Sequence, residues 1–470
     1  MRNIARALSL ALPLSLYATG ALAQSAPPSL PAPSSDPLQI DISKDPILLL
    51  AREEAPRQLF NATIAAAVEH HPATQEAIAL TAQAGSVIDE AIERRMPSVD
   101  VNVTSYRVIA RDFSNDPNNI IERSRASQRT DASLQINQNI LDFGASGSRV
   151  NSARARFRSA AADAEGNAEQ TAMNGISAWY DVFAYRALVT LSEAFVKNQQ
   201  ELREAVAERI RQGVSAQGDT ARVDSYLASA QTRLASFRRQ LSSAEARLSE
   251  LTGTPPPAQV LQPPAPLMPT MTQDAVAMAS MRGSASRSAQ ALADSARQEA
   301  RASRADRLPQ IGVGIDAGRY GVFENATDFD IRGLVTMRQH LFGGTEARLA
   351  QAQAKARSAD AHAARIREES ARDASIAWSD VRALEEQLTA MEASYIASRR
   401  SRDVLIERFI NSRGDLFDVV QSESSYFETA TSYIQALTQL GAARYILLAR
   451  MGQLLPTLGI EPEKVGGRSE

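Results

Sequence analysis

Side chains able to perform covalent or metal chemistry are few in this sequence. The 470 residues include no cysteine, which excludes disulfides and thiolate metal sites. The adjacent His70 and His71 precede Pro72 with no His or Cys clustered nearby, so we interpret them as a helix-to-turn pair and not as a metal site. No Ser-His-Asp order, Walker sequence or glycine-rich phosphate loop occurs. We therefore expect neither an enzyme nor a bound cofactor.

Acidic residues stand at the start of one expected helix. Asp415 and Asp418 open a helix that we expect over residues 415–453, and Gln421 follows one turn later. Carboxylates at a helix N-terminus complement the helix dipole whatever the protein does. We prefer this structural explanation for Asp415, and for Asp418 we keep it beside a functional role.

Regular hydrophobic spacing predicts the long helices that position these carboxylates. Apolar residues recur every seven residues from Leu227 to Leu248, and mostly apolar residues follow in alternating steps of four and three over 384–409 and 426–451. This is the seam of a coiled coil, and we interpret it as helix packing and not as a ligand site. Helices are expected over 58–95, 145–212, 219–252, 270–307, 344–412 and 415–453. The two longest would each extend about 100 Å at 1.5 Å per residue, and in each half two shorter helices would stack beside the long one.

An internal duplication organises the chain. Trp179 and Trp378 lie 199 residues apart (378 − 179), and the same offset relates Arg209 to Arg408 and Leu248 to Leu447. The matches follow one order along the chain. We therefore expect two structural repeats, 55–256 and 268–456, joined by a proline-rich linker over 257–267. A period this long indicates that each half is a substantial module and not a short solenoid unit.

Two short alternating segments precede each long helix. Residues 99–103 and 134–140 alternate apolar and polar side chains, as do 311–317 and 331–337. A period of two predicts strands, and hairpins of about ten residues per strand are typical of outer-membrane barrels. An edge hairpin of a soluble sheet would have the same pattern.

The N-terminal residues indicate export. Arg2 and Arg6, the apolar residues 8–16 and Ala21-Leu-Ala23 predict a secretory signal peptide over 1–23. A Pro/Ser-rich leader is expected over 24–54 and a flexible tail over 457–470. No run of about 18 apolar residues follows Gln24, so only a closed β-barrel would place the mature chain in a membrane. The net charge of −3 argues against a nucleic-acid partner.

Four strands cannot close a barrel, and an open sheet edge cannot lie in lipid. The long helices also bury little surface alone. Closure therefore predicts a ring of identical chains, with 8 strands from two copies or 12 from three.

Over residues 55–456 the chain resembles the TolC-like outer membrane factors. The signal peptide, the duplicated halves, the strand-to-helix junctions ending at Gly144 and Gly344, and the paired tryptophans carry this resemblance. It implies a mainly α fold: a homotrimer with a long coiled-coil α-barrel and a 12-stranded β-barrel in outer-membrane lipid. Such channels are exit ducts of type I secretion or drug efflux, docking a periplasmic adaptor (membrane fusion) protein and an inner-membrane ABC or RND-type pump. The absence of an acylation cysteine argues against the lipoprotein branch, and residues 408–428 look most like the type I secretion branch.

The resemblance also implies which turns dock the adaptor and close the pore. These are residues 209–219, with Gly213, Val214 and Asp219, and residues 408–418, with Ser412, Arg413 and Gly414. Ser412 replaces the turn glycine of the family, and Gln421 replaces its second acidic position. Asp418 matches a pore-facing aspartate, with Asp415 and Gln421 as further gate candidates. Three copies of Asp418 would form a narrow carboxylate ring that favours cations.

Two other classes of protein remain as alternatives. A periplasmic coiled-coil structural or adaptor protein would carry the strands as a small soluble sheet, although an adaptor normally has one helical hairpin and not two equal copies. An exported enzyme is disfavoured because no catalytic constellation occurs.

Overall fold

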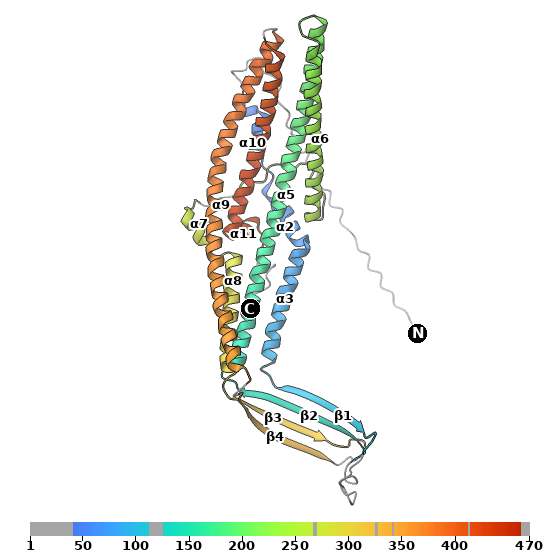
Figure 1. The fold of residues 1–470 in the computed structure, drawn as a ribbon, viewed down its shortest axis with the longest axis vertical. Coiled ribbons are helices and arrows are strands. Elements are labelled where there is room, and N and C mark those ends of the chain that lie inside the picture. Colours follow the sequence, from blue (N-terminus) through green and yellow to red (C-terminus); the bar gives the residue numbers. More distant parts are fainter. Residues whose placement is uncertain are drawn as a thin grey trace, which may run out of the picture.

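The chain is a long helical rod with a four-stranded sheet at one end (Figure 1). This computed structural model describes residues 41–111, 126–266, 270–324, 328–340, 343–411 and 414–461. The expected signal peptide lies outside these residues. The mainly helical fold with one strand pair per repeat is confirmed. Among the described residues, no helix combines the length and hydropathy needed to cross a bilayer.

The first repeat has one long helix beside shorter ones. Its elements are α2 (Arg57–His70), α3 (Pro72–Glu93), β1 (Ser98–Arg107), β2 (Gln128–Leu141), α5 (Ala145–Arg211) and α6 (Gly218–Thr252). The 67 residues of α5 extend about 100 Å at 1.5 Å per residue. Helices α3 and α6 pack along α5, one beyond the other (Figure 1), as the expected lengths indicated.

The second repeat has the same order of elements. They are α7 (Gln273–Ser280), α8 (Ser284–Ala305), β3 (Gln310–Arg319), β4 (Phe329–Arg338), α9 (Thr345–Ile410) and α10 (Leu416–Arg450). Helices α8 and α10 pack along α9, and α5 packs against both α8 and α10. The two repeats therefore form one continuous bundle.

The continuous helices expected over 58–95 and 270–307 are wrong, because each is broken. His71 is extended (φ −69°, ψ 129°), as the residue before a proline prefers, and its Nδ1 accepts the N–H of Ala73 at 3.2 Å. The helix-to-turn interpretation of this histidine is thus confirmed. In the second repeat, extended Gly283 (φ −64°, ψ 168°) separates α7 from α8.

Both ends of the described chain contain short helices that pack on the core. Residues 41–54, assigned to the leader, include a 3-10 turn (Ile42–Lys44) and α1 (Pro46–Leu49), and Ile47 is fully buried. Helix α11 (Leu454–Leu458) extends into the expected tail and buries Leu458. Apolar side chains in both segments pack into the central core. The composition of the residues around these segments did not predict this packing.

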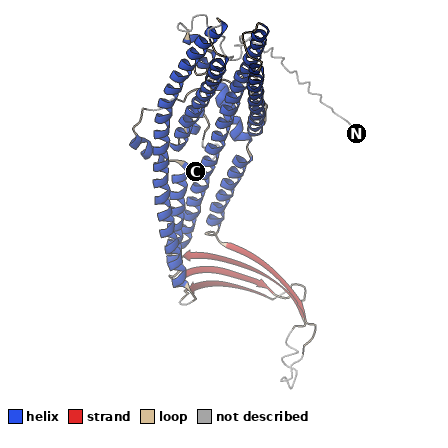
Figure 2. Cartoon of the chain, turned by 45° about the horizontal axis from the view of Figure 1, so that its top comes forward, coloured by secondary structure: helices blue, strands red, loops and turns tan. Residues whose placement is uncertain are grey.

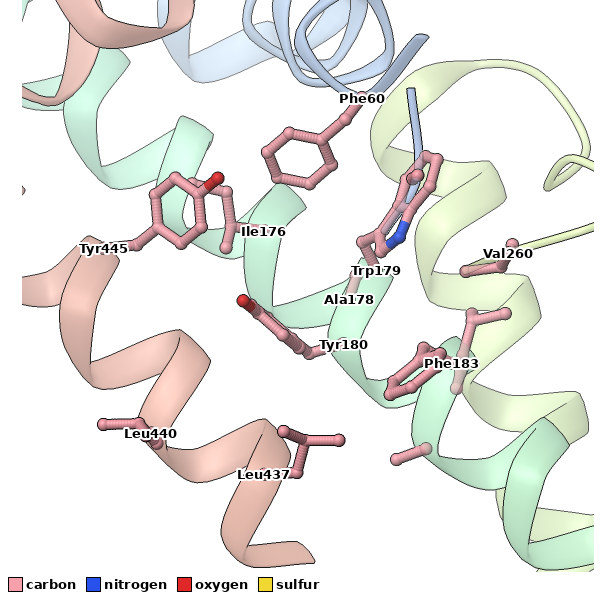
Figure 3. Packing of buried hydrophobic residues seen from close by; sticks show 14 of the residues in the cluster. Phe60, Ile176, Ala178, Trp179, Tyr180, Phe183, Val260, Leu437, Leu440 and Tyr445 are labelled. Atoms are coloured by element: carbon pink, nitrogen blue, oxygen red, sulfur yellow. The ribbon is translucent and has the colours of Figure 1, made fainter. Parts of the chain in front are cut away.

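Trp179 is fully buried in the main apolar core (Figure 3). Its ring meets that of Phe60 edge-on, with centroids 5.3 Å apart, and its Nε1 donates to the carbonyl of Leu261 at 2.9 Å. Trp378 donates in the same way to the carbonyl of Met271 at 3.2 Å. Both tryptophans therefore hold the segment between α6 and α7, which contains Leu261 and Met271.

Candidate functional site

The four strands form one antiparallel sheet in the order β1-β2-β3-β4, which projects from the helices as a single curved layer (Figure 2). Pairing of β2 with β3 joins the repeats. The register aligns Val101, Leu134, Ala317 and Ile331 in one row across all four strands. Because side chains alternate between faces, this row defines an apolar face. Val101 is 73% exposed and Ile331 67% exposed, so the protomer leaves that face uncovered.

The opposite face of the sheet is polar. The adjacent row aligns Asp100, Gln135, Asp316 and Arg332. A sheet with one exposed apolar face and one polar face fits a boundary between lipid and water. Strands β1 and β4 have no outer partner strand in the described part of the chain. Their free edges can be satisfied in lipid only by strands of further chains.

Glycines turn the chain from the sheet into each long helix. Gly144 (φ 84°) precedes α5, and Gly344 (φ 82°) precedes α9. The Asp142 carboxylate accepts the N–H groups of Gly144 at 3.0 Å and Ser146 at 2.7 Å. Left-handed backbone at both positions favours glycine, so the matching sequence junctions have a structural cause.

Two helix turns form the tip of the rod at the end away from the sheet (Figure 1). After α5, Gly213 has φ 75°, Val214 is 56% exposed, and the Asp219 carboxylate accepts the N–H of Ala216 at 3.1 Å. Gly213 therefore occupies a backbone position that glycine favours. Asp219 stabilises the turn that precedes its helix.

The second turn contains the acidic candidates. Asp415 is the N-cap of α10 and accepts the N–H of Phe417 at 3.2 Å, so its preferred structural explanation holds. Asp418 and Gln421 are exposed on the next turns of α10, and Gly414 is half-buried. Ser412 and Arg413 lie outside the described residues.

The two tips are tied together within the chain. Val206, Val223, Phe409, Leu416, Val419 and Val420 form a separate apolar cluster there. Arg209 of α5 donates through Nη1 to the carbonyl of Phe409 at 2.9 Å, and its guanidinium lies 4.4 Å from the Phe409 ring centroid. The apolar cluster and the Arg209 contact therefore join the first helical hairpin (α5–α6) to the second (α9–α10).

A buried polar network lies farther from the tip, between α9 and α10. Arg402 and Asp403 are fully buried and paired, with Nε to Oδ1 at 2.8 Å, and Glu423 lies 4.0 Å from Arg402. The Arg402 guanidinium also lies 4.2 Å from the ring centroid of Tyr426. Helix α5 contributes Asn198, which hydrogen-bonds Glu423.

The network continues to the N-terminal segment. The Tyr426 and Tyr395 hydroxyls lie 2.9 Å apart, and the Tyr395 hydroxyl donates to the Asp45 carboxylate at 2.9 Å. Asp45 also pairs with Arg399. With Glu423 neutral, Arg399 and Arg402 balance Asp45 and Asp403. Burial raises the pKa of Glu423, although Arg402 and Asn198 oppose it, and this direction agrees with the charge balance.

This network was not among the sites predicted from the sequence. Two signals were present: Tyr395 and Arg402 interrupt an apolar seam, and Arg203 with Asp224 recurs 199 residues later as Arg402 with Glu423. Burial of the second pair depends on α5 and on residue 45, which no local pattern connects to α9. Among the described residues, no group of three or more His, Asp or Glu side chains could hold a metal ion.

Comparisons with known proteins agree with this geometry. Residues 63–254 match the sequence model of the family described as outer membrane efflux protein. No curated protein matches the chain significantly. The fold is similar to that of the outer membrane protein VceC from Vibrio cholerae, with 16% identity, a TM-score of 0.72, and coverage of 84% of this chain and 96% of that one.

Two solved outer membrane channels are similar to a comparable degree. Campylobacter jejuni CmeC shares 13% identity with a TM-score of 0.72, covering 84% of this chain and 86% of that one. The open state of Neisseria gonorrhoeae MtrE shares 16% identity with a TM-score of 0.70, covering 84% and 89%. At these identities the likeness shows the fold. Together with the match over the first repeat, it confirms the resemblance stated from the sequence.

Proposed function

We propose that this chain, a TolC-like outer membrane factor by its fold and by the family match of its first repeat, is one protomer of a homotrimeric channel in the outer membrane. The two-faced sheet at the end of the helical rod carries this proposal. Its apolar face would contact outer-membrane lipid, and its polar face would line a water-filled pore. The helices, of about 100 Å, would continue that pore through the periplasm.

Closure supports the trimer. The free edges of β1 and β4 would pair with neighbouring protomers, so that three copies give a 12-stranded barrel. The helical hairpins would close into a tube in the same ring. No residue cluster described above supports an enzymatic activity, and we assign none.

The tip would be the docking and gating end of the channel. The turn residues Gly213, Val214 and Asp219, with 412–414 of the second hairpin, would contact a periplasmic adaptor protein, and through it an inner-membrane ABC or RND-type pump. The exposed Asp418 would repeat three times around the pore at this end, with Gln421 one turn farther along. The result would be the exit duct of a tripartite export system.

The cargo is either secreted protein or small molecules. Residues 408–428 resemble the type I secretion branch, whereas the matching family is described as efflux protein. Deletion of the gene separates these roles. Loss of a secreted protein with unchanged drug susceptibility would indicate type I secretion, and the reverse would indicate efflux.

Membrane fractionation tests the proposal itself. The processed protein should sediment with outer membranes, resist extraction by high salt and urea, and run as a trimer after detergent solubilisation. A protein that stays soluble after lysis without detergent would instead be the periplasmic coiled-coil protein considered as the alternative.

A further inference from the structure

Two basic grooves run along the helices at the end next to the sheet, where α8 lies between α5 and α9 (Figure 1). The first has a volume of about 430 Å³ and is lined by residues of α5 and α8. The second has a volume of about 420 Å³ and is lined by residues of α8 and α9. The charged residues of the two grooves are Arg154, Arg158, Arg297, Arg301, Arg357 and Asp294. Five arginines from both repeats therefore share one surface, which we call the arginine face.

Nearby carboxylates neutralise only part of this charge. Asp294 lies within ion-pair distance of both Arg158 and Arg297, and Arg297 also pairs with Asp360. Three further arginines are exposed and form no ion pair with the part of the chain that the structure describes: Arg154, Arg301 and Arg357. The arginine face therefore keeps an excess of positive charge and unused guanidinium donors.

The other side of the same helices has no such excess. Arg149 and Arg156 leave α5 on the side away from Arg154, since two or five residues correspond to more than a third of a turn. Arg149 pairs with Asp306, and Arg156 lies 3.9 Å from Glu299. Between α5 and α8, unpaired positive charge is thus confined to the arginine face.

The arginine face would lie on the outside of the proposed ring. Arg154 precedes Trp179 by about seven helical turns, and Arg357 precedes Trp378 by about six, so each arginine leaves its helix on the side of the tryptophan. That side of the bundle carries a second layer, formed by α2 and by the segment that leads to α7. A second layer inside the ring would fill the pore, so an open pore requires it to lie outside.

Helix α8 carries basic side chains up to the sheet. Arg297, Arg301 and Arg304 follow one side of it at intervals of four and three residues, and Arg304 is the last residue but one. At 1.5 Å per residue, Arg297 lies only about 12 Å from the helix end. Beyond the helices, the exposed Leu308 and Phe143 begin the apolar surface of the sheet end. Apolar side chains followed by basic ones are typical of a membrane interface.

We propose that the arginine face binds the phosphate groups of anionic phospholipids at the periplasmic surface of the membrane. This inference rests on the proposed membrane placement and adds a lipid-binding site to it. Guanidinium groups recognise phosphate through paired N–H donors, and anionic headgroups attract arginines that lie close to a bilayer. A lipid fits better than a soluble anion, because its headgroup can meet the arginines while its acyl chains meet the apolar face of the sheet.

Binding of fluorescent phosphatidylglycerol to the purified full-length protein in a neutral detergent tests the site. Wild type should bind this lipid about a hundredfold more tightly than phosphatidylcholine, which carries a phosphate but no net charge. Arg154→Gln, Arg301→Gln and Arg357→Gln combined should abolish the preference, because each arginine near an anionic lipid contributes about a fivefold factor. These substitutions leave the ion pairs of Asp294 intact.

A matched variant controls for the change in net charge. Arg239→Gln, Lys355→Gln and Arg400→Gln combined remove the same charge from exposed positions away from the arginine face. Lys355 lies on the opposite side of α9 from Arg357, two residues away. This variant should keep the preference for phosphatidylglycerol. Equal losses in two variants that are both folded by circular dichroism would overturn the proposed site.

Competition separates a lipid from a soluble anion. Inorganic phosphate and soluble polyglutamate, each at the concentration of the lipid, should leave phosphatidylglycerol bound. Displacement by either would overturn the lipid assignment and show that the grooves take soluble anions.

The outcomes also separate this inference from the proposed function. Both grooves lie within one chain, so binding can be measured whatever the oligomeric state. A trimeric channel without a preference for phosphatidylglycerol would refute the lipid site and leave the channel. Protein that stays soluble after lysis without detergent would refute the channel, and with it the membrane placement of this site.

Discussion

Arg402 lies fully buried among Asp403, Glu423 and the ring of Tyr426. Removing a charge from water is costly, so a buried arginine is stable only while its acidic partners and hydrogen bonds remain in place. The three residues come from both helices of the second hairpin, and Tyr426 extends the network to Tyr395 and the N-terminal segment. The network therefore makes the position of residue 45 depend on the packing of α9 against α10.

We predict that Arg402→Ala lowers the free energy of unfolding by about 3–5 kcal/mol, because it breaks the buried ion pair between Arg402 and Asp403. Arg400→Ala, two residues away and exposed, should change it by less than about 0.5 kcal/mol. The measurement is thermal unfolding of the purified protein by circular dichroism. Equal shifts for the two variants would show that the buried pairing contributes no more than a surface arginine.

A second prediction concerns pH. Burial raises the pKa of Glu423, so the folded protein keeps a proton that the unfolded chain releases above its ordinary pKa of about 4.3. This contribution to stability is complete below that pH and is lost as the pH rises toward the raised value. Glu423→Gln mimics the protonated form and should remove that loss.

Melting temperatures measured from about pH 5 to about pH 8 test the predicted direction of this pH dependence of stability. The difference between Glu423→Gln and wild type should grow in favour of the variant as the pH rises. A difference that shrinks with pH would show that the ionised carboxylate is the form stabilised by Arg402.

At the scale of elements, the sheet is the part whose two faces differ most. Its register puts apolar rows on one face and polar rows on the other across strands from both repeats. Neighbouring residues on one strand therefore meet opposite environments. This arrangement makes adjacent positions on β1 a matched pair for substitution.

We predict that Val101→Arg reduces the yield of outer-membrane trimers far more than Asn102→Arg. An arginine on the lipid face costs about 2–4 kcal/mol near the bilayer midplane, whereas the pore face accepts it in water. The readout is the amount of heat-modifiable trimer in isolated outer membranes. Similar yields would show that the apolar face does not contact lipid.

The fold could be predicted in large part because its signals are periodic. Heptad spacing located α6 and α10, and the 199-residue offset related the two repeats. The breaks at His71 and Gly283 were missed because helical composition continues on both sides of each. Pro72 is the first residue of α3 and therefore lies at the first break. Proline is common at the first position of a helix, but the prediction did not use it to divide the segment into two helices.

Site residues could be predicted only where function depends on local position. Asp415 lies at the start of α10, where the sequence predicted a helix start, whereas the roles of the turn residues stay predictions. The buried network joins residues 45 and 402, and the hydrogen bond of Arg209 to the Phe409 carbonyl joins the two hairpins, both through tertiary packing. No spacing within one helix connects these positions, although the repeat offset marks their counterparts.

In the whole molecule as proposed, a ring of three chains, each residue occurs three times around the pore axis. Asp418 is exposed near the tip of one chain, and three copies around a narrow pore would concentrate negative charge. Asp415, three residues earlier, instead satisfies a backbone N–H of its own helix.

We predict that Asp418→Ala lowers the cation-to-anion permeability ratio of the channel. Asp415→Ala should leave that ratio unchanged while destabilising the start of α10 by about 1 kcal/mol. Reversal potentials in asymmetric salt give the ratio for both variants. An unchanged ratio for Asp418→Ala would show that Asp418 acts only as a carboxylate at the helix N-terminus and does not affect ion selectivity.

Recording from purified wild-type protein in a planar lipid bilayer is the direct test of the proposal that three copies of this chain form a membrane channel. A trimeric channel should give discrete conductance steps with a preference for cations, from protein that runs as a trimer in the same detergent. Protein that is fully folded by circular dichroism but never produces a conductance step, at any concentration that permits insertion, would contradict it.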